Sequence, residues 1–229
     1  MSYAVMQPYL FPYLGYYQLV NSVSAFVFYD DVNFIKRGYI NRNNILSNGK
    51  SLRFTVPVIN ASQNKLIKDL SFDDNVKKIL KTIEQSYKKA PYFEAVYSIV
   101  ETVLNSENRS LEHVCGKSIT LIFKYLGIQK YFYYSSELEY RRDLAAADKL
   151  IEIGKKLEMG DYVNSPGGKA LYSKEYFSSK NVNLSFIEID SYEYSQHTEQ
   201  FIPHLSMIDV LMWNSPTQVK LLLDKYKLT

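Results

Sequence analysis

Two alternating hydrophobic periodicities constrain the fold of this chain more than any other feature. Residues 3–6 and 25–29 are short apolar runs typical of buried strands, and residues 15–22 between them have the pattern of a helix. Further helices are expected at residues 110–126, 145–157 and 171–178, and further strands at residues 130–135, 161–164 and 184–189. This alternation predicts a three-layer α/β fold, with a mostly parallel sheet and helices on both of its faces.

Two segments depart from the alternation. Residues 39–58 contain two strand-like runs around Asn48-Gly49, a dipeptide that readily adopts positive φ in a tight turn, so they predict a β-hairpin. Residues 73–105 have a helical periodicity that Pro91 interrupts, because proline cannot continue a helix. They predict a helical insert of two helices.

The end of the chain contains two more helical patterns, at residues 206–213 and 217–226. A length of 229 residues is close to the size of one large domain. We therefore expect residues 1–229 to form a single α/β domain.

Charge and terminal sequence limit the classes of protein to consider. The net charge of +3 arises from 27 basic and 24 acidic residues, whereas nucleic-acid-binding proteins usually have a stronger basic excess. The N-terminal residues do not resemble a secretion signal, and no apolar run reaches the length of about 18 residues that spans a membrane. The sequence predicts a cytoplasmic protein without membrane insertion.

Tyrosine is the unusual residue of the composition, with 21 copies against a single tryptophan. Tyrosine combines an apolar ring with a hydrogen-bonding hydroxyl, which suits polar ligand pockets and interfaces. A compositional bias of the genome explains the same number equally well.

Polar side chains follow the first two predicted strands, at the edge where open α/β sheets bind ligands. The first loop supplies Gln7, Tyr9 and Tyr13, stiffened by two prolines. The candidates in the second loop are Asp30, Asp31, Lys36, Arg37, Asn41 and Arg42. Arginines can bind a diphosphate through paired hydrogen bonds, and a carboxylate can take a proton from an amine. The alternative is that the two aspartates pair with the neighbouring cations to order the loop.

A third candidate segment lies between a predicted strand and the next predicted helix. It contains Ser165, Gly167, Gly168 and Lys169. Glycines let a ligand approach the backbone, and the free N–H groups of a helix N-terminus bind anions. An ordinary strand-to-helix turn is the alternative.

His204 is the best single histidine for acid or base chemistry. It precedes Ser206, which can cap the helix that follows, and Asp209, which stands at the position of the acid in a capping box. The functional alternative makes His204 and Asp209 an acid/base pair.

Cys115 falls on the apolar face of its predicted helix and is expected to be a small core residue rather than a nucleophile. A single cysteine cannot form an internal disulfide, which fits a reducing compartment. The histidines have no metal-ligand spacing, so no metal site is expected.

Four ordered stretches resemble the WbqC-like protein family, and together they extend over nearly the whole chain. They are residues 6–19, 29–43, 164–168 and 205–212. One departure is Asn44, where the family pattern leads us to expect an arginine.

The resemblance implies an accessory enzyme of O-antigen, lipopolysaccharide or other bacterial surface polysaccharide biosynthesis. The implied reaction transfers glycine or another aminoacyl group to the amine of a nucleotide-linked amino sugar. The chemical roles that we assign are a proton acceptor (Asp30, Asp31 or His204), phosphate ligands (Arg37, Arg42 and Lys169) and an oxyanion site (Gly167 and Gly168).

Two other functions remain open at this point. One is an ATP-dependent amide ligase that would need Mg²⁺, and the other is a non-catalytic accessory protein that binds a sugar nucleotide. The sequence also leaves open the sugar, the oligomeric state, and the aminoacyl donor or carrier, which is a charged transfer RNA, a carrier protein or an adenylate. A charged transfer RNA is the one nucleic acid that we consider as a partner.

Overall fold

The computed structural model describes residues 1–229 and contains a central sheet of six strands. The strands, in spatial order, are β10 (Tyr226–Leu228), β9 (Asn183–Ile189), β8 (Asp161–Asn164), β1 (Ser2–Met6), β2 (Ala25–Phe28) and β7 (Tyr131–Tyr134). Neighbouring strands are parallel, except that β10 runs antiparallel to β9. The prediction of a mostly parallel α/β sheet is confirmed.

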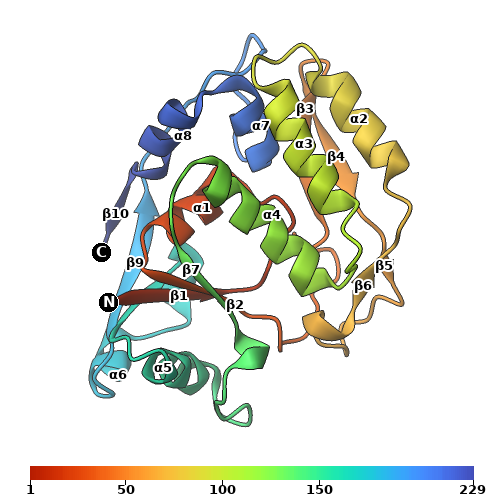
Figure 1. Cartoon of the computed structure of the whole chain (residues 1–229). Coiled ribbons are helices and arrows are strands. Elements are labelled where there is room, and N and C mark those ends of the chain that lie inside the picture. Colours follow the sequence, from red (N-terminus) through yellow and green to blue (C-terminus); the bar gives the residue numbers. More distant parts are fainter.

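Helices cover both faces of this sheet (Figure 1). Because side chains alternate along a strand, Ala4 packs with α1 (Leu14–Asn21) and α4 (Leu111–Tyr125) on one face. Its neighbour Val5 packs on the other face with α5 (Ala146–Lys156) and α6 (Lys174–Ser178). The predicted three layers are therefore present.

An outer lobe is added beyond α4. It contains the hairpin β3 (Arg42–Ser47) and β4 (Lys50–Thr55), the short pair β5 (Val58–Ile59) and β6 (Ser71–Phe72), and the helices α2 (Lys77–Tyr87) and α3 (Phe93–Leu104). Asn48 and Gly49 form the hairpin turn with φ angles of 50° and 71°, as the sequence predicts. The hairpin and the helical insert are both confirmed, and the hairpin forms a sheet of its own.

The end of the chain differs from the prediction. After α7 (Met207–Trp213), helix α8 (Pro216–Leu223) ends three residues earlier than expected, and the chain turns into β10. The buried Gln18 side chain donates to the carbonyls of Leu222 (2.9 Å) and Lys225 (3.1 Å), which stabilises this turn. The edge strand therefore depends on a residue some 200 positions away in the sequence.

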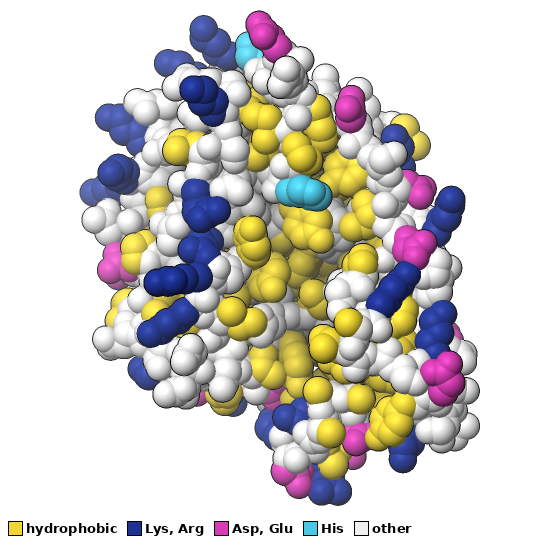
Figure 2. Space-filling model, turned by 180° about the vertical axis from the view of Figure 1, so that it is seen from behind, with side chains coloured by type: hydrophobic (Ala, Val, Ile, Leu, Met, Phe, Trp, Pro, Cys, Tyr) yellow, Lys and Arg dark blue, Asp and Glu magenta, His cyan; other side chains and the backbone are white.

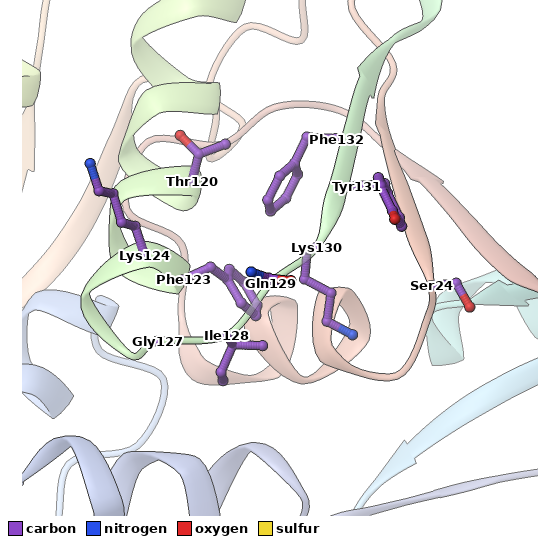
Figure 3. Close-up of a pocket in the computed structure, with 10 residues that line it drawn as sticks. All are labelled: Ser24, Thr120, Phe123, Lys124, Gly127, Ile128, Gln129, Lys130, Tyr131 and Phe132. Atoms are coloured by element: carbon purple, nitrogen blue, oxygen red, sulfur yellow. The ribbon is translucent and has the colours of Figure 1, made fainter.

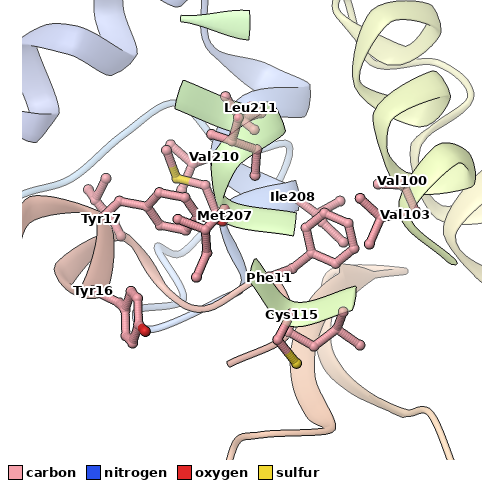
Figure 4. Close-up of a cluster of buried hydrophobic side chains, with 14 of the residues drawn as sticks. Phe11, Tyr16, Tyr17, Val100, Val103, Cys115, Met207, Ile208, Val210 and Leu211 are labelled. Atoms are coloured by element: carbon pink, nitrogen blue, oxygen red, sulfur yellow. The ribbon is translucent and has the colours of Figure 1, made fainter. Parts of the chain in front are cut away.

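Figure 4 shows the centre of the larger core, where residues from the first loop, α1, α3, α4 and α7 meet. Phe11 lies beside Ile208 and Val103, and Cys115 is fully buried, with its thiol 3.4 Å from the Ile40 carbonyl. The expectation that Cys115 is a core residue is confirmed. No helix has both the length and the apolar character needed to cross a membrane.

Candidate functional site

The five parallel strands end at one edge of the sheet. From β1 the chain passes through α1 to β2 on one face, whereas from β8 it passes through α6 to β9 on the other face. The direction of winding therefore reverses between β1 and β8, which is where open α/β sheets bind ligands. The loops that follow these two strands border that position.

The loop after β1 is held by residues 40–43 and by Ser206, two distant segments of the chain. The Leu10 N–H donates to the Ile40 carbonyl at 3.0 Å. The Phe11 carbonyl accepts from the Asn43 amide and from the Ser206 hydroxyl, both at 2.7 Å. Phe11 has a φ of 43°, a left-handed conformation that is uncommon for a bulky residue, so tertiary contacts must maintain it. These hydrogen bonds hold the loop in one conformation.

A pocket of about 290 Å³ opens beside this loop. It is lined by Tyr9, Pro12, Tyr13, Tyr39, Asn43, Asn44, Pro203 and His204. Figure 2 shows hydrophobic side chains, tyrosines included, in a hollow on one face of the molecule, with a histidine among them. Aromatic rings with hydroxyl and amide groups at their margins suit a ligand that has both C–H faces and hydroxyls, such as a sugar.

His204 lies at this pocket with its ring edge-on to Tyr13, at a centroid distance of 5.9 Å. Its side chain is exposed, and its φ of 59° is another left-handed conformation of a non-glycine residue. Strained backbone of this kind is concentrated at functional sites. His204 is the one imidazole in the pocket lining.

The candidates of the first loop divide between the pocket and the scaffold. Tyr9 and Tyr13 line the pocket. Gln7 does not, and its carbonyl accepts a 2.8 Å hydrogen bond from the Tyr16 hydroxyl. Since the Tyr9 ring also packs 5.6 Å from that of Tyr16, the position of Tyr9 depends on the first helix.

Asp30 lies elsewhere and connects two strands. One of its oxygens accepts from the Ser136 N–H and the Ser135 hydroxyl, both at 2.9 Å, and the other accepts from the Ser136 hydroxyl at 2.6 Å. Both serines belong to the 3-10 helix Ser135–Glu137, which directly follows β7. The buried carboxylate is therefore saturated with donors that join the end of β2 to the end of β7.

Asp31 is equally engaged. Tyr140 donates to both of its oxygens at 2.9 and 2.8 Å, and Arg142 Nε donates at 2.7 Å. The Asp31 side chain is only 1% exposed, whereas that of Arg142 is 45% exposed. Neither aspartate lines the pocket. The alternative pairing with Lys36 and Arg37 is not formed, because serines, Tyr140 and Arg142 bind the carboxylates instead.

The basic and amide residues of the second loop differ in burial and in their hydrogen-bond partners. Arg42 is half-buried and its Nε donates to the Gly38 carbonyl at 2.8 Å, next to Tyr39 of the pocket. The Asn41 amide donates to the Val56 carbonyl and is structural. Lys36 and Arg37 are exposed and form no salt bridge.

The segment after β8 is not the helix N-terminus that the sequence predicts. Residues Pro166–Ala170 form a 3-10 helix, and α6 begins only at Lys174. The Gly168 N–H already donates to the Ser165 carbonyl at 2.9 Å, and Lys169 pairs with Glu188. Ser173 caps α6 by accepting a hydrogen bond from the Tyr176 N–H at 3.2 Å, so the helix starts three residues later than predicted. The Gly168 N–H is therefore not free to bind an anion, in contrast to the sequence prediction of a helix N-terminus here.

Asp209 is fully buried and accepts hydrogen bonds from three side chains, whereas the sequence predicts only a helix cap or a partner of His204. Its oxygens accept from the hydroxyls of Tyr87 (2.7 Å) and Tyr194 (2.9 Å) and from the Gln196 amide (3.1 Å). Burial raises the pKa of this carboxyl to about 6, although the three hydrogen bonds act in the opposite direction. Ser206 does cap α7, through its 3.3 Å contact with the Ile208 N–H, but Asp209 completes no capping box and does not bond to His204.

Five pocket residues were not among the candidates chosen from the sequence, namely Pro12, Tyr39, Asn43, Asn44 and Pro203. Asn43 belongs to the second family-like stretch, so that match was the one signal that could have identified it. Pro203 and His204 reach the pocket only through the tertiary fold, because the backbone of residues 13 and 206 forms an isolated antiparallel bridge.

Another cavity, of about 780 Å³, lies at the opposite edge of the sheet, where β2 and β7 begin (Figure 3). Its Lys130 ammonium donates to the carbonyls of Asn21 (2.6 Å) and Val23 (2.7 Å), and thereby stabilises the end of α1. The cavity contains no acid, histidine or thiol, so it offers little chemistry. No group of three or more His, Cys, Asp or Glu residues is arranged to hold a metal ion.

Comparison with known proteins gives two matches over most of the chain. The chain is 24% identical over 213 residues to "Uncharacterized protein Rv1507c" of Mycobacterium tuberculosis (strain ATCC 25618 / H37Rv), covering 91% of each protein. No solved structure matches. The model of the WbqC-like protein family matches residues 7–221, which include the first loop, the hairpin and the segment around His204. This chain is therefore a member of the WbqC-like protein family.

Proposed function

We propose that this protein transfers glycine or another aminoacyl group to the amine of a nucleotide-linked amino sugar, in the biosynthesis of a bacterial surface polysaccharide such as O-antigen. The observation that supports this function best is the pocket in which aromatic and amide side chains surround the exposed His204. Its volume of about 290 Å³ is near the lower limit for ligand sites and suits one sugar ring rather than a whole nucleotide sugar.

His204 is the proton acceptor in this proposal. The amine of the bound sugar attacks the carbonyl carbon of the aminoacyl donor, so that a C–N bond forms and the bond from carbonyl carbon to the leaving oxygen breaks. His204 takes the proton of the attacking nitrogen and returns it to the leaving oxygen. We assign the base to His204 rather than to Asp30 or Asp31, because the oxygens of both aspartates accept hydrogen bonds from donors outside the pocket.

The rest of the ligand is expected to extend past Tyr39. Arg42 is hydrogen-bonded to Gly38, beside that tyrosine, and Lys36 and Arg37 are exposed in the same loop. These cations are suited to the diphosphate of a nucleotide sugar. The Asn44 amide at the pocket wall can stabilise the oxyanion of the tetrahedral intermediate.

A mass-spectrometric assay tests the proposal. Purified protein is incubated with a nucleotide-linked 4-amino sugar, glycine and ATP, with and without a cell extract that supplies carriers. A product heavier by one glycyl unit only with extract supports transfer from a carrier, and a product formed with ATP alone identifies a ligase. If the protein binds the sugar nucleotide but forms no product, the result would favour a non-catalytic accessory protein over an enzyme.

His204→Asn is the most informative variant, because asparagine tolerates positive φ but cannot accept the proton. We expect kcat to fall by roughly 10²–10⁴-fold with little change in KM. His113→Asn is the matched control, since His113 lies on α4 and borders another cavity that has no part in the proposal. Equal activity of both variants would remove His204 from the mechanism.

A further inference from the structure

Residues 36–89 are far more basic than the rest of the chain. They contain twelve Lys and Arg residues against four Asp and Glu, whereas the remaining residues contain fifteen and twenty. Residues 36–89 therefore have a net charge of +8, and the rest of the chain has a net charge of −5, which together give +3. We call the Lys and Arg side chains of residues 36–89 the basic lobe.

The charges of the basic lobe are not neutralised within the protein. None of its twelve cations takes part in any of the six salt bridges of the structure. Eleven are exposed, and Arg42 is half-buried. By contrast, Arg142, Lys169 and Lys227 outside the lobe each pair with an acid.

The fold gathers these cations beside the proposed active site. Helix α2 packs on strand β3, whose Asn43 and Asn44 line the sugar pocket. In Figure 2, Lys and Arg side chains are concentrated on the side of the hollow where this lobe lies, and acids are few there. Helix α2 is about 15 Å long from Lys77 to Tyr87, at a rise of about 1.5 Å per residue, and Lys88 and Lys89 follow directly after it. The lobe thus provides a long cationic surface next to the pocket.

A second cavity at one end of the lobe strengthens this interpretation. It has a volume of about 340 Å³ and is bordered by Lys88, Lys89 and the hairpin turn at Asn48. His197 also lines it, and no acid does. The indole N–H of Trp213, another lining residue, is buried without a hydrogen-bond partner. This cavity is suited to an anionic oxygen.

The composition of the lobe favours a nucleic acid over a protein. Nine of its twelve cations are lysines. Lysine is depleted in protein–protein interfaces, whose centres are apolar, but binds phosphates well as a compact charge. Contacts between lysines and phosphates need no apolar centre, and they provide most of the affinity of sequence-independent nucleic-acid binding.

We propose that nine cations of the basic lobe, from Lys50 to Lys89, bind the phosphate backbone of an RNA that delivers the aminoacyl group, whereas Lys36, Arg37 and Arg42 remain with the sugar nucleotide. This identification of the donor depends on the proposed function. The donor would be an aminoacyl ester at the 3′-terminal ribose of the RNA. The sugar amine forms the new C–N bond, the ester C–O bond breaks, and the ribose hydroxyl leaves with the proton returned by His204. The ester itself supplies the free energy, so no nucleoside triphosphate is consumed in the transfer step.

Fluorescence anisotropy with end-labelled, deacylated transfer RNA tests this binding without any transfer reaction. The full-length protein should bind with a Kd of about 10⁻⁴–10⁻⁶ M near physiological salt, and the affinity should fall steeply between about 50 and 200 mM salt. The double variant Lys88→Glu/Lys89→Glu should bind about tenfold more weakly and show a smaller salt dependence.

The matched control is Lys155→Glu/Lys156→Glu, which makes the same change of charge at the end of α5, another exposed lysine pair. Equal weakening by both double variants, or by neither, would overturn the proposal, as would stronger binding to an acidic carrier protein or to anionic lipid vesicles. RNA binding without glycyl transfer would contradict the proposed function alone. Glycyl transfer that requires the extract but proceeds without RNA binding would contradict the basic lobe alone.

Discussion

The Tyr87 hydroxyl donates a 2.7 Å hydrogen bond to the carboxylate of Asp209, which joins α2 to α7 across 122 residues of sequence. The same hydroxyl accepts from the Leu46 N–H of the hairpin at 2.8 Å. Asp209 also accepts from Gln196, whose amide bonds both backbone groups of Ile202 at 2.9 Å, two residues before His204. One buried carboxylate therefore connects α2, the hairpin and the segment that presents His204.

The first prediction concerns the pH dependence of stability. Burial raises the pKa of Asp209 to about 6 in the folded protein, above the value of about 3.9 for an unfolded chain. The folded state then holds the proton more tightly, so this contribution to stability is complete below about pH 4 and is lost as pH rises through about 6. Its size is about 2–3 kcal/mol.

Asp209→Asn removes this dependence. The free energy of unfolding of the parent, relative to that of the variant, should decrease by about 2–3 kcal/mol between pH 4 and pH 7 in urea titrations. Glu94→Gln, at an exposed carboxylate, serves as the control. A constant difference between parent and Asp209→Asn across this range would contradict the prediction.

The second prediction separates two neighbouring arginines. Arg142→Met leaves the buried Asp31 without its cation and removes hydrogen bonds to the carbonyls of Ser136 (3.2 Å) and Leu138 (3.1 Å). We expect it to lower the free energy of unfolding by about 2–4 kcal/mol. Arg141→Met breaks only an exposed pair with Asp143, and should cost less than about 1 kcal/mol. Similar urea midpoints for the two variants would argue against a structural role of the Asp31 pair.

The third prediction compares the adjacent glycines after β8. A Cβ at Gly168 would lie 2.4 Å from Nδ2 and 2.8 Å from Cγ of the buried Asn164, so Gly168→Ala should destabilise the protein by about 1–3 kcal/mol. At Gly167 the nearest atom is Ser165 Oγ at 4.0 Å, and Gly167→Ala should stay within about 0.5 kcal/mol of the parent. Thermal unfolding of both variants measures this contrast, which a tolerated Gly168→Ala would refute.

The fourth prediction distinguishes the sugar pocket from the larger cavity at the opposite edge. Tyr39 is 52% exposed, so Tyr39→Ala should fold normally but weaken nucleotide-sugar binding about tenfold, since an aromatic contact contributes about 1 kcal/mol or more. Tyr131, which is 67% exposed and lines the larger cavity, provides the control Tyr131→Ala. Isothermal titration calorimetry should show a loss of affinity only for the first variant, and the reverse result would move the site to the cavity of Figure 3.

The elements of this fold were predictable because their signals are local. The period of the apolar residues distinguishes strands from helices, and Asn48-Gly49 and Ser206 act on backbone groups within a few residues of themselves. These features establish the parallel sheet, the helices on both faces, the hairpin and the start of α7. The motifs also identified Tyr9, Tyr13 and His204, which do line the pocket.

The partners of the polar groups were decided only by the tertiary structure. Asp30 and Asp31 bind residues more than 100 positions away, although cations stand close to them in the sequence. Asp209 is enclosed by Tyr87 and Tyr194, and Gln18 determines where the last strand begins. Burying a charge or an amide is unfavourable unless it is hydrogen-bonded, so each such group depends on whichever distant segment the packed core places beside it. That spatial arrangement is absent from any local pattern of residues.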